Sequence, residues 1–236
     1  MGLAHSPRIV TDNLVLALDA ANTKSYSGSG TTWTDLSGKG NNGTLTGGPT
    51  YSSSDSGYFD FDGSNDTVTF SSNNIDGLSS GSATQFSIMG WVKWDVLNSG
   101  PTAWFEKQNA TGANVRLELS ADHDTVSGGR VWFVTSDTST SVSAGLVYYI
   151  LDTNKYYHMA LVCDGTSKKA YINGVEEYSV TENFSSTYPS NSYTLGIGGV
   201  QRKFNGRVAN VAIYNKPLTA SEISQNFNAH RGRYGI

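Results

Sequence analysis

The sequence predicts an all-β protein, a single antiparallel β-sandwich with one short helix near its C-terminal end. Three observations favour this class. The 236 residues include 26 Gly, 13 Tyr, 9 Phe and 5 Trp, a mixture that is typical of many strands joined by turns. Strand-like runs recur along the chain, whereas only one stretch carries the signals of a helix. The length is ordinary for one sandwich, so we expect an N-terminal arm over residues 1–11 and one domain over residues 12–236.

The first expected strand is the apolar run NLVLALDA at residues 13–20. A glycine-rich loop follows at residues 33–44. We expect Trp33 and Leu36 to close one end of the core. The glycines of this loop, Gly43 among them, are expected to take the positive φ angles of successive tight turns.

The next two segments also read as strands. Residues 58–70 predict a hairpin in which Phe59 and Phe61 share one face and residues 63–66 form the turn. Residues 86–94, FSIMGWVKW, are apolar on both faces. This pattern is typical of a strand in the middle of a sandwich.

The second half of the chain continues with short strand patterns. They lie at residues 102–107, 114–119, 130–135, 146–151, 156–163 and 192–198. Residues 171–178 predict a hairpin, because Asn173-Gly174 is a preferred type I′ turn pair between alternating strands. The single cysteine, Cys163, lies in an apolar strand and is interpreted as a small buried residue.

The C-terminal stretch predicts a strand followed at once by a helix. Residues 208–214 are rich in β-branched and aromatic side chains. Thr219 is the expected N-cap, and Glu222 stands three residues later to complete a capping box. Ile223 and Phe227 are four residues apart, so they form an apolar face that can pack on the sheet.

This last strand and helix resemble the closing segment of laminin-G-like modules, which often reads G-x-ID-VRIYNRALS-x-EI. The matching residues here are Gly206, Val208, Val211, Ile213, Tyr214, Asn215, Lys216, Pro217, Leu218, Thr219, Glu222 and Ile223. Residues 33–44 (WTDLSGKGNNGT), 58–70 (YFDFDGSNDTVTF) and 156–178 resemble further segments of the same family. The resemblance implies a concanavalin A-like jelly roll.

Charge and hydropathy exclude several classes of function. The net charge is −4 and only 15% of the residues are charged, so the basic surface that nucleic acid requires is not expected. No stretch approaches the roughly 18 apolar residues of a membrane span, so no membrane insertion is expected. The first ten residues lack the apolar core of a secretory signal. If the protein works outside a cell, we expect it to leave by lysis, by a dedicated exporter or as part of a particle.

The residues that carry catalysis in related scaffolds do not form a pattern here. Glycoside hydrolases on this sandwich often carry E-x-D-x-x-E along one strand, because cleavage needs two carboxylates at a fixed separation. Glu176 and Glu177 are adjacent and point to opposite faces, and Glu118 is followed at i+2 by Ser120. The four histidines are scattered and show no zinc spacing. We therefore expect a non-enzymatic protein.

Calcium is the one cofactor that the sequence suggests, because laminin-G-like modules often hold it near a loop rim. Oxygen ligands are available in the family loops, from Asp35, Asn41, Asp62 and Asp66. Residues 122–124 offer a further acidic loop. The alternative, which we favour, is that these side chains cap turns by hydrogen bonding to the local backbone.

Glycan binding is the sharper hypothesis. Sugars bind to aromatic faces and to amide or carboxylate groups. The candidates in the less family-like middle section are Trp104, Trp132, Tyr148 and Tyr149. The alternative for each tryptophan, which we favour for any single one, is core packing, since its neighbours are also apolar. Tyr148 and Tyr149 are adjacent in an expected strand, so one ring has to point away from the surface that the other packs against.

Within the family, residues 9–51 and 226–236 most resemble laminin-G-like proteins encoded by tailed phages and their hosts. The resemblance implies a non-enzymatic virion surface protein, either a capsid decoration or a fibre component. Such a protein is expected to be extracellular without a signal peptide, to contact other virion proteins and copies of itself, and to bind host glycans. The alternatives are a free-standing bacterial carbohydrate-binding module and a glycan-cleaving enzyme on the same scaffold.

Overall fold

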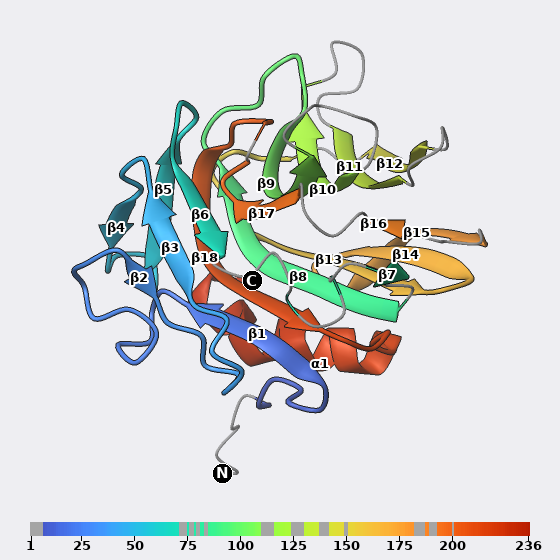
Figure 1. The fold of residues 1–236 in the computed structure, drawn as a ribbon, viewed down its shortest axis with the longest axis horizontal. Coiled ribbons are helices and arrows are strands. Elements are labelled where there is room, and N and C mark those ends of the chain that lie inside the picture. Colours follow the sequence, from blue (N-terminus) through green and yellow to red (C-terminus); the bar gives the residue numbers. More distant parts are fainter. Residues whose placement is uncertain are drawn as a thin grey trace.

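The structure is a computed structural model. It describes residues 7–70, 75, 78, 81–82, 85–109, 116–123, 130–136, 142–148, 151–181, 187–188, 193–199 and 201–236. Within these residues the chain forms two antiparallel sheets and the helix α1 (Ala220–His230), which runs into a 3-10 turn at Arg231–Arg233. The prediction of an all-β sandwich with a short C-terminal helix is confirmed (Figure 1). The limits of the arm and the domain stay a prediction.

Sheet A is built around two long central strands, β8 (Gln85–Trp94) and β18 (Asn205–Tyr214). On one side of this pair the sheet continues through β13 (Tyr157–Asp164), β14 (Ser167–Ile172) and β15 (Val175–Thr181). On the other side it continues through β5 (Tyr58–Asp62) and β4 (Thr50–Ser52). The first strand, β1 (Leu14–Asp19), also pairs with β18.

Sheet B faces sheet A across the core. Its order is β12 (Val142–Tyr148), β11 (Arg130–Ser136), β10 (Arg116–Asp122), β9 (Thr102–Asn109), β17 (Tyr193–Ile197), β6 (Thr67–Phe70), β3 (Gly43–Thr46) and β2 (Thr32–Trp33). A separate small pair joins β7 (Gly81–Ser82) to β16 (Thr187–Tyr188).

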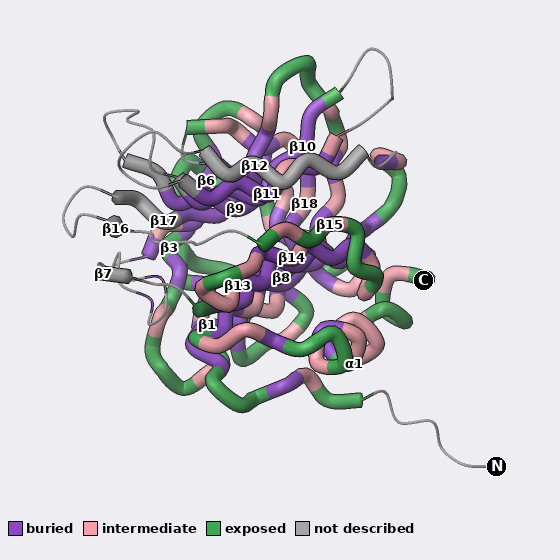
Figure 2. The backbone as a smooth tube through the Cα atoms, turned by 90° about the vertical axis from the view of Figure 1, so that its right-hand side faces the viewer, coloured by how far each residue is buried: buried purple, intermediate pink, exposed green. Residues whose placement is uncertain are grey.

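The inward-facing side chains of the two sheets form one apolar core, and the buried segments of Figure 2 follow the strands. Its largest members include Phe59, Phe61, Phe86, Trp94, Trp104 and Phe105. Cys163 is buried in the same core, as expected from the sequence. Burial raises the pKa of its thiol to about 12, so this residue acts as a small apolar side chain.

The outer face of sheet A is covered by α1. The Trp91 ring of β8 stacks on Phe227, with ring centroids 5.6 Å apart, and on Tyr234, at 4.3 Å. Ile223 is fully buried and joins Met89 in a second apolar cluster. This cover explains why β8 is apolar on both faces, as the sequence predicted.

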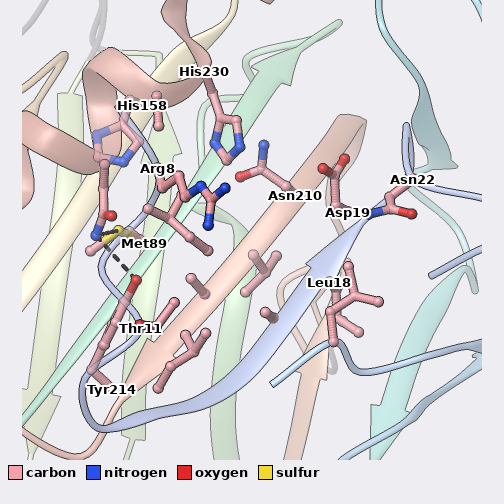
Figure 3. Close-up of a pocket in the computed structure, with 18 of the residues that line it drawn as sticks. Arg8, Thr11, Leu18, Asp19, Asn22, Met89, His158, Asn210, Tyr214 and His230 are labelled. Carbon is pink, nitrogen blue, oxygen red and sulfur yellow. Dashed lines mark hydrogen bonds between the residues drawn. The ribbon is translucent and has the colours of Figure 1, made fainter. Parts of the chain in front are cut away.

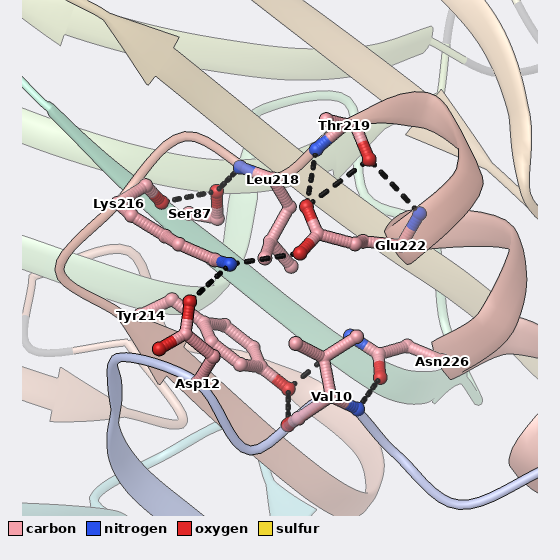
Figure 4. A network of polar contacts seen from close by, with 9 residues as sticks. All are labelled: Val10, Asp12, Ser87, Tyr214, Lys216, Leu218, Thr219, Glu222 and Asn226. Carbon is pink, nitrogen blue, oxygen red and sulfur yellow. Dashed lines mark hydrogen bonds and ion pairs between the residues drawn. The ribbon is translucent and has the colours of Figure 1, made fainter.

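The start of α1 and the N-terminal arm are held by a polar network (Figure 4). The expected capping box is present, since the Glu222 backbone N–H donates to Thr219 Oγ1 and the Thr219 N–H donates to Glu222 Oε2. Lys216 Nζ lies 2.8 Å from carboxylate oxygens of both Asp12 and Glu222.

Two further hydrogen bonds tie the arm to the end of the chain. The Val10 N–H donates to Asn226 Oδ1 at 2.8 Å, and the Tyr214 hydroxyl donates to the Val10 carbonyl at 2.8 Å.

The hairpin expected at residues 58–70 is wrong. Strand β5 belongs to sheet A, where it pairs with β4 and β18, whereas β6 belongs to sheet B, where it pairs with β3 and β17. The turn at residues 63–66 therefore carries the chain across the sandwich. The reason is that Phe61 and Val68 both point into the core, and each supplies a different wall of it.

Two details of the loop at residues 33–44 also differ from expectation. Trp33 is fully buried as predicted, but Leu36 is 37% exposed. Gly43 has no positive φ. It is required for space instead, because a Cβ atom there would lie 2.5 Å from Val68 Cγ1. The Asn173-Gly174 turn is confirmed, with φ angles of 51° and 79°.

Candidate functional site

Among the predicted glycan-binding aromatics, Trp104 is a core residue. It is 0% exposed, and its ring packs against Gly90 of the opposite sheet, where a Cβ atom would lie 2.8 Å from Trp104 Cζ3. The expectation that Trp104 faces a ligand is therefore corrected in favour of the alternative, core packing. Leu119 pairs with Phe105 and Ser120 pairs with Ala103, so Trp104 is the extra residue of a bulge in β9, and this bulge accompanies its inward position.

Trp132 lies on the outer face of sheet B, the face that points away from sheet A. Its neighbours Val131 and Phe133 belong to the core, so the alternation of β11 directs Trp132 outward. It is partly exposed. The Arg130 guanidinium carbon lies 5.3 Å from the Trp132 ring centroid, within the range of a cation–π contact.

The two predicted tyrosines are placed only in part. Tyr148 lies opposite Arg130 in the register between β12 and β11, and Leu146 lies opposite Trp132. The side chain of Tyr148 and the whole of Tyr149 lie outside the described residues. The structure thus brings the positions of Trp132 and Tyr148 onto adjacent strands.

Strand β10 contributes polar side chains to the same outer face. Leu117, Leu119 and Ala121 point into the core, so Glu118, Ser120 and Asp122 point outward. The Asp122 carboxylate accepts two hydrogen bonds from the Arg130 guanidinium, from Nε at 2.9 Å and from Nη2 at 2.8 Å. A bidentate pair of this kind fixes the guanidinium in the plane beside the indole ring.

Glu106 of β9 lies directly opposite Glu118 of β10, so two carboxylates are neighbours across the sheet. Arg202 Nε lies 2.9 Å from Glu118 Oε2, and Ser120 Oγ donates to Glu118 Oε1. Glu106 Oε2 accepts the Gln201 N–H at 2.9 Å. Its Oε1 is buried and has no hydrogen-bond partner among the described residues.

Sequence reasoning missed this pair because the two glutamates are 12 positions apart. Only the register of β9 on β10 brings them together. The sequence did indicate that each glutamate points out of the core. Glu106 and Glu118 stand between apolar or long side chains, in FEK and LEL, where an outward position is expected.

The predicted metal ligands Asp35 and Asn41 lie in the glycine-rich loop after β2. Asp35 Oδ1 accepts the backbone N–H groups of Ala17 and Ser37, both at 2.9 Å, and Oδ2 accepts the Asn41 N–H at 3.0 Å. Asn41 Nδ2 donates to the Val15 carbonyl at 2.7 Å. Both side chains therefore fasten the loop to β1, which is the turn-capping alternative.

Asp62 and Asp66 lie in the crossing turn between the sheets. Asp62 Oδ1 accepts the Ser64 N–H at 2.7 Å, and Asp66 Oδ2 accepts the Asp62 N–H at 3.0 Å. Desolvation raises the pKa of Asp66. Among the described residues, no three His, Cys, Asp or Glu side chains gather as a metal site would require. A calcium ion would compete with these hydrogen bonds, and its binding stays a prediction.

Comparison with solved structures shows the same fold in several other proteins. Domain 4 of AbnA, an extracellular arabinanase from Geobacillus stearothermophilus, in complex with arabinotriose, is 23% identical with a TM-score of 0.66, over 91% of this chain and 98% of that one. The binding domain of Paraclostridial Mosquitocidal Protein 1 is 18% identical with a TM-score of 0.71, over 93% and 53%. Trypanosoma rangeli sialidase is 15% identical with a TM-score of 0.61, over 97% and 34%.

These identities show the fold alone, and the chain spans about half of the mosquitocidal binding domain and about a third of the sialidase. No curated protein matches the sequence. Within the described part of the chain, no helix has the length and apolar character needed to cross a bilayer. Residues 62–224 match the family model of the laminin-G type described as the concanavalin A-like lectin/glucanases superfamily. The chain belongs to this superfamily.

Proposed function

We propose that the protein binds carbohydrate, without cleaving it, on the outer face of sheet B. The observation that carries the proposal is Trp132, a partly exposed indole whose ring lies beside the fixed Arg130–Asp122 pair. An aromatic face accepts the C–H groups of a sugar, and neighbouring charged groups hydrogen-bond its hydroxyls.

The two arginines paired with buried carboxylates on this face are themselves partly exposed. The side chains of Arg130 and Arg202 are 26% and 27% exposed, whereas their partners Asp122 and Glu118 are almost fully buried. The carboxylates therefore orient the guanidinium groups on this face. The AbnA domain with arabinotriose shows that a protein of this fold can be found with an oligosaccharide.

A glycan array followed by calorimetry tests the proposal. Trp132→Ala is expected to weaken binding at least tenfold, because it removes the central contact of the interface. Trp132→Phe keeps a ring and is expected to retain most of the affinity. Leu36→Ala changes an exposed apolar residue of the loop at residues 33–44, away from Trp132 in the sequence, and serves as the control. The absence of any glycan signal, or equal affinity of Trp132→Ala and the parent, contradicts the proposal.

For the biological setting, we propose a virion surface protein, a capsid decoration or fibre component, that acts outside the cell in several copies. The support is the sequence resemblance of residues 9–51 and 226–236 to laminin-G-like proteins of tailed phages and their hosts. Light scattering of the purified chain, with and without a chelator, measures its copy number and any dependence on calcium. An oligomer without a glycan signal favours decoration. A monomer that binds glycans favours the alternative, a free-standing bacterial carbohydrate-binding module.

One observation favours a second candidate function, glycan cleavage. Glu106 and Glu118 are opposite each other on adjacent strands, where Cβ atoms lie about 4.5–5.5 Å apart. Retaining glycosidases hold their two carboxyl groups at about 5–5.5 Å. Both side chains are at most 1% exposed, however, and they bind Gln201 and Arg202 of the chain itself.

This burial supports binding over cleavage. Incubation with arabinan and other oligosaccharides, analysed for shortened products, separates the two functions. Products that disappear in a Glu106→Gln variant of unchanged fold would establish the enzyme.

A further inference from the structure

A cavity of about 490 Å³ lies on the outer face of sheet A, far from the glutamate pair in the fold (Figure 3). It is lined by residues of α1, the N-terminal arm, β1 and β18 and opens to solvent. Its apolar lining includes Leu14, Ala17, Leu18, Met89, Val211 and Ala212. Ligand sites for small molecules have volumes of about 300–1,000 Å³, so this cavity has the size of a binding site.

The charges around the cavity leave one cation uncompensated. Asp19 is neutralised by Arg233, whose Nη1 lies 3.1 Å and 2.9 Å from the two carboxylate oxygens. Arg8 also lines the cavity and is exposed. Its guanidinium makes no ion pair or hydrogen bond with any residue that the structure describes. The charged side chains that line the cavity therefore leave one positive charge, that of Arg8, without a counter-charge.

Two histidines border the cavity without adding charge at neutral pH. His158 is 2% exposed, and its burial lowers the pKa of the imidazole to about 3. Burial lowers the pKa of His230 to about 4. A neutral imidazole has one N–H donor and one acceptor nitrogen. Nδ1 of His158 has no partner among the described residues, so it is a buried polar group that the protein leaves unused.

Polar groups from different parts of the chain meet above the apolar floor. Figure 3 shows Arg8, His230 and Asn210 pointing toward the same space. The amide of Asn210 is held by a hydrogen bond from its Nδ2 to the Tyr234 hydroxyl, 3.2 Å long. The Gln225 side chain holds the Arg8 backbone by donating to its carbonyl at 2.7 Å. The arginine is therefore positioned by α1 at the cavity.

We propose that this cavity binds a small organic monocarboxylate, with its carboxylate on the Arg8 guanidinium and its apolar body on the floor of the cavity. A planar guanidinium matches a carboxylate in a bidentate arrangement. One uncompensated cation balances one negative charge, and the neutral imidazoles and the Asn210 amide add hydrogen bonds. The apolar floor favours a body of hydrocarbon character.

Cyclohexanecarboxylate and its uncharged amide, cyclohexanecarboxamide, are the probes for this site. Calorimetry and NMR titration of the full chain are expected to show saturable binding of the carboxylate, with the amide at least tenfold weaker. Arg8→Gln is expected to weaken carboxylate binding at least tenfold. Arg231→Gln removes an exposed arginine that does not line the cavity and is expected to leave the affinity unchanged.

Two further variants separate this site from the proposed carbohydrate site. Ala212→Leu narrows the cavity and is expected to abolish binding of the probe, with circular dichroism as the check on the fold. Trp132→Ala is expected to leave carboxylate binding unchanged. Equal binding of the two probes, unchanged affinity in Arg8→Gln, or no saturable binding of cyclohexanecarboxylate would each overturn the proposal.

Discussion

The two sheets of this sandwich present outer faces of opposite character. The outer face of sheet A is covered by α1 and packs ring on ring, as Trp91 does against Phe227 and Tyr234. The outer face of sheet B carries Glu106, Glu118 and Asp122, all at most 1% exposed.

The comparison shows two ways to bury one side of a sheet. On sheet A, burial removes apolar surface from water and needs only complementary shapes. On sheet B, each buried carboxylate requires a donor, because an unpaired buried charge is costly. The first face serves stability, whereas the second keeps charged and aromatic groups in fixed positions, as a binding surface requires.

The largest difference in stability is expected between variants of two tryptophans, Trp91 on the outer face of sheet A and Trp132 on the outer face of sheet B. Trp91→Ala removes a fully buried ring and is expected to lower the free energy of unfolding by about 3–5 kcal/mol. Trp132→Ala removes a partly exposed ring and is expected to cost less than half as much. Urea denaturation followed by circular dichroism measures both. Equal losses would show that the two faces contribute alike to stability.

The second difference in stability concerns two Arg–Asp pairs, of which Arg130–Asp122 uses two guanidinium nitrogens and Arg233–Asp19 uses one. Arg130→Met leaves Asp122 buried, with a side-chain exposure of 2%, and is expected to destabilise the fold by about 2–3 kcal/mol. Arg233→Met leaves Asp19, which is 14% exposed, and is expected to cost about 1 kcal/mol or less. Thermal unfolding at pH 7 compares them, and the reverse order would contradict the proposed role of burial on sheet B.

A fall in pH is expected to lower the stability of the fold through two histidines, His158 and His230, at the outer face of sheet A. The pKa values of His158 and His230 are lowered to about 3 and about 4 in the folded chain, whereas the unfolded value is about 6.5. At a pH between the folded and unfolded pKa values, the unfolded chain binds more protons than the folded chain does. Stability therefore falls as the pH falls below about 6.5, by about 1 kcal/mol per pH unit for each histidine.

Denaturation series between pH 7 and pH 4.5 test this dependence. His158→Leu is expected to flatten the slope. Thr44→Ala changes an exposed residue of sheet B that has no titratable group and is expected to leave the slope as it is. An unchanged slope in His158→Leu would refute the assignment.

The smallest change in the free energy of unfolding is expected for a substitution at the start of α1. Thr219→Ala removes the N-cap of the helix that covers sheet A and is expected to cost about 1 kcal/mol. Thr44→Ala changes an exposed strand residue of sheet B and is expected to stay within about 0.5 kcal/mol of the parent. Differential scanning calorimetry resolves this difference, and identical melting temperatures would argue against a stabilising cap.

Local patterns predicted much of the fold. The capping box at Thr219 and Glu222 and the turn at Asn173-Gly174 depend on neighbouring residues only, so both could be read from the sequence. The apolar pattern of residues 86–94 likewise indicated a strand that is covered on both faces. The crossing turn at residues 63–66 could not be read, because a turn sequence does not say whether the next strand joins the same sheet.

The candidate site was less predictable for the same reason. Trp104 and Trp132 have similar apolar neighbours, yet a bulge in β9 accompanies the inward position of Trp104, while strict alternation directs Trp132 outward. The pairing of Glu106 with Glu118 depends on strand register, which links residues far apart in the chain. The cavity requires still longer connections, between Arg8 and Gln225 for example.

The hydrogen bond from Val10 to Asn226 spans 216 positions of the chain, and it has a consequence for how the protein is made. During synthesis, β8 emerges more than a hundred residues before α1. Until α1 has been made, the Trp91 ring lacks its contacts with Phe227 and Tyr234. Contacts of such long range form slowly, and exposed apolar surface promotes aggregation in the interval. A chain that stops before residue 220 lacks α1, which covers the outer face of sheet A. Such a chain is thus expected to depend on chaperones.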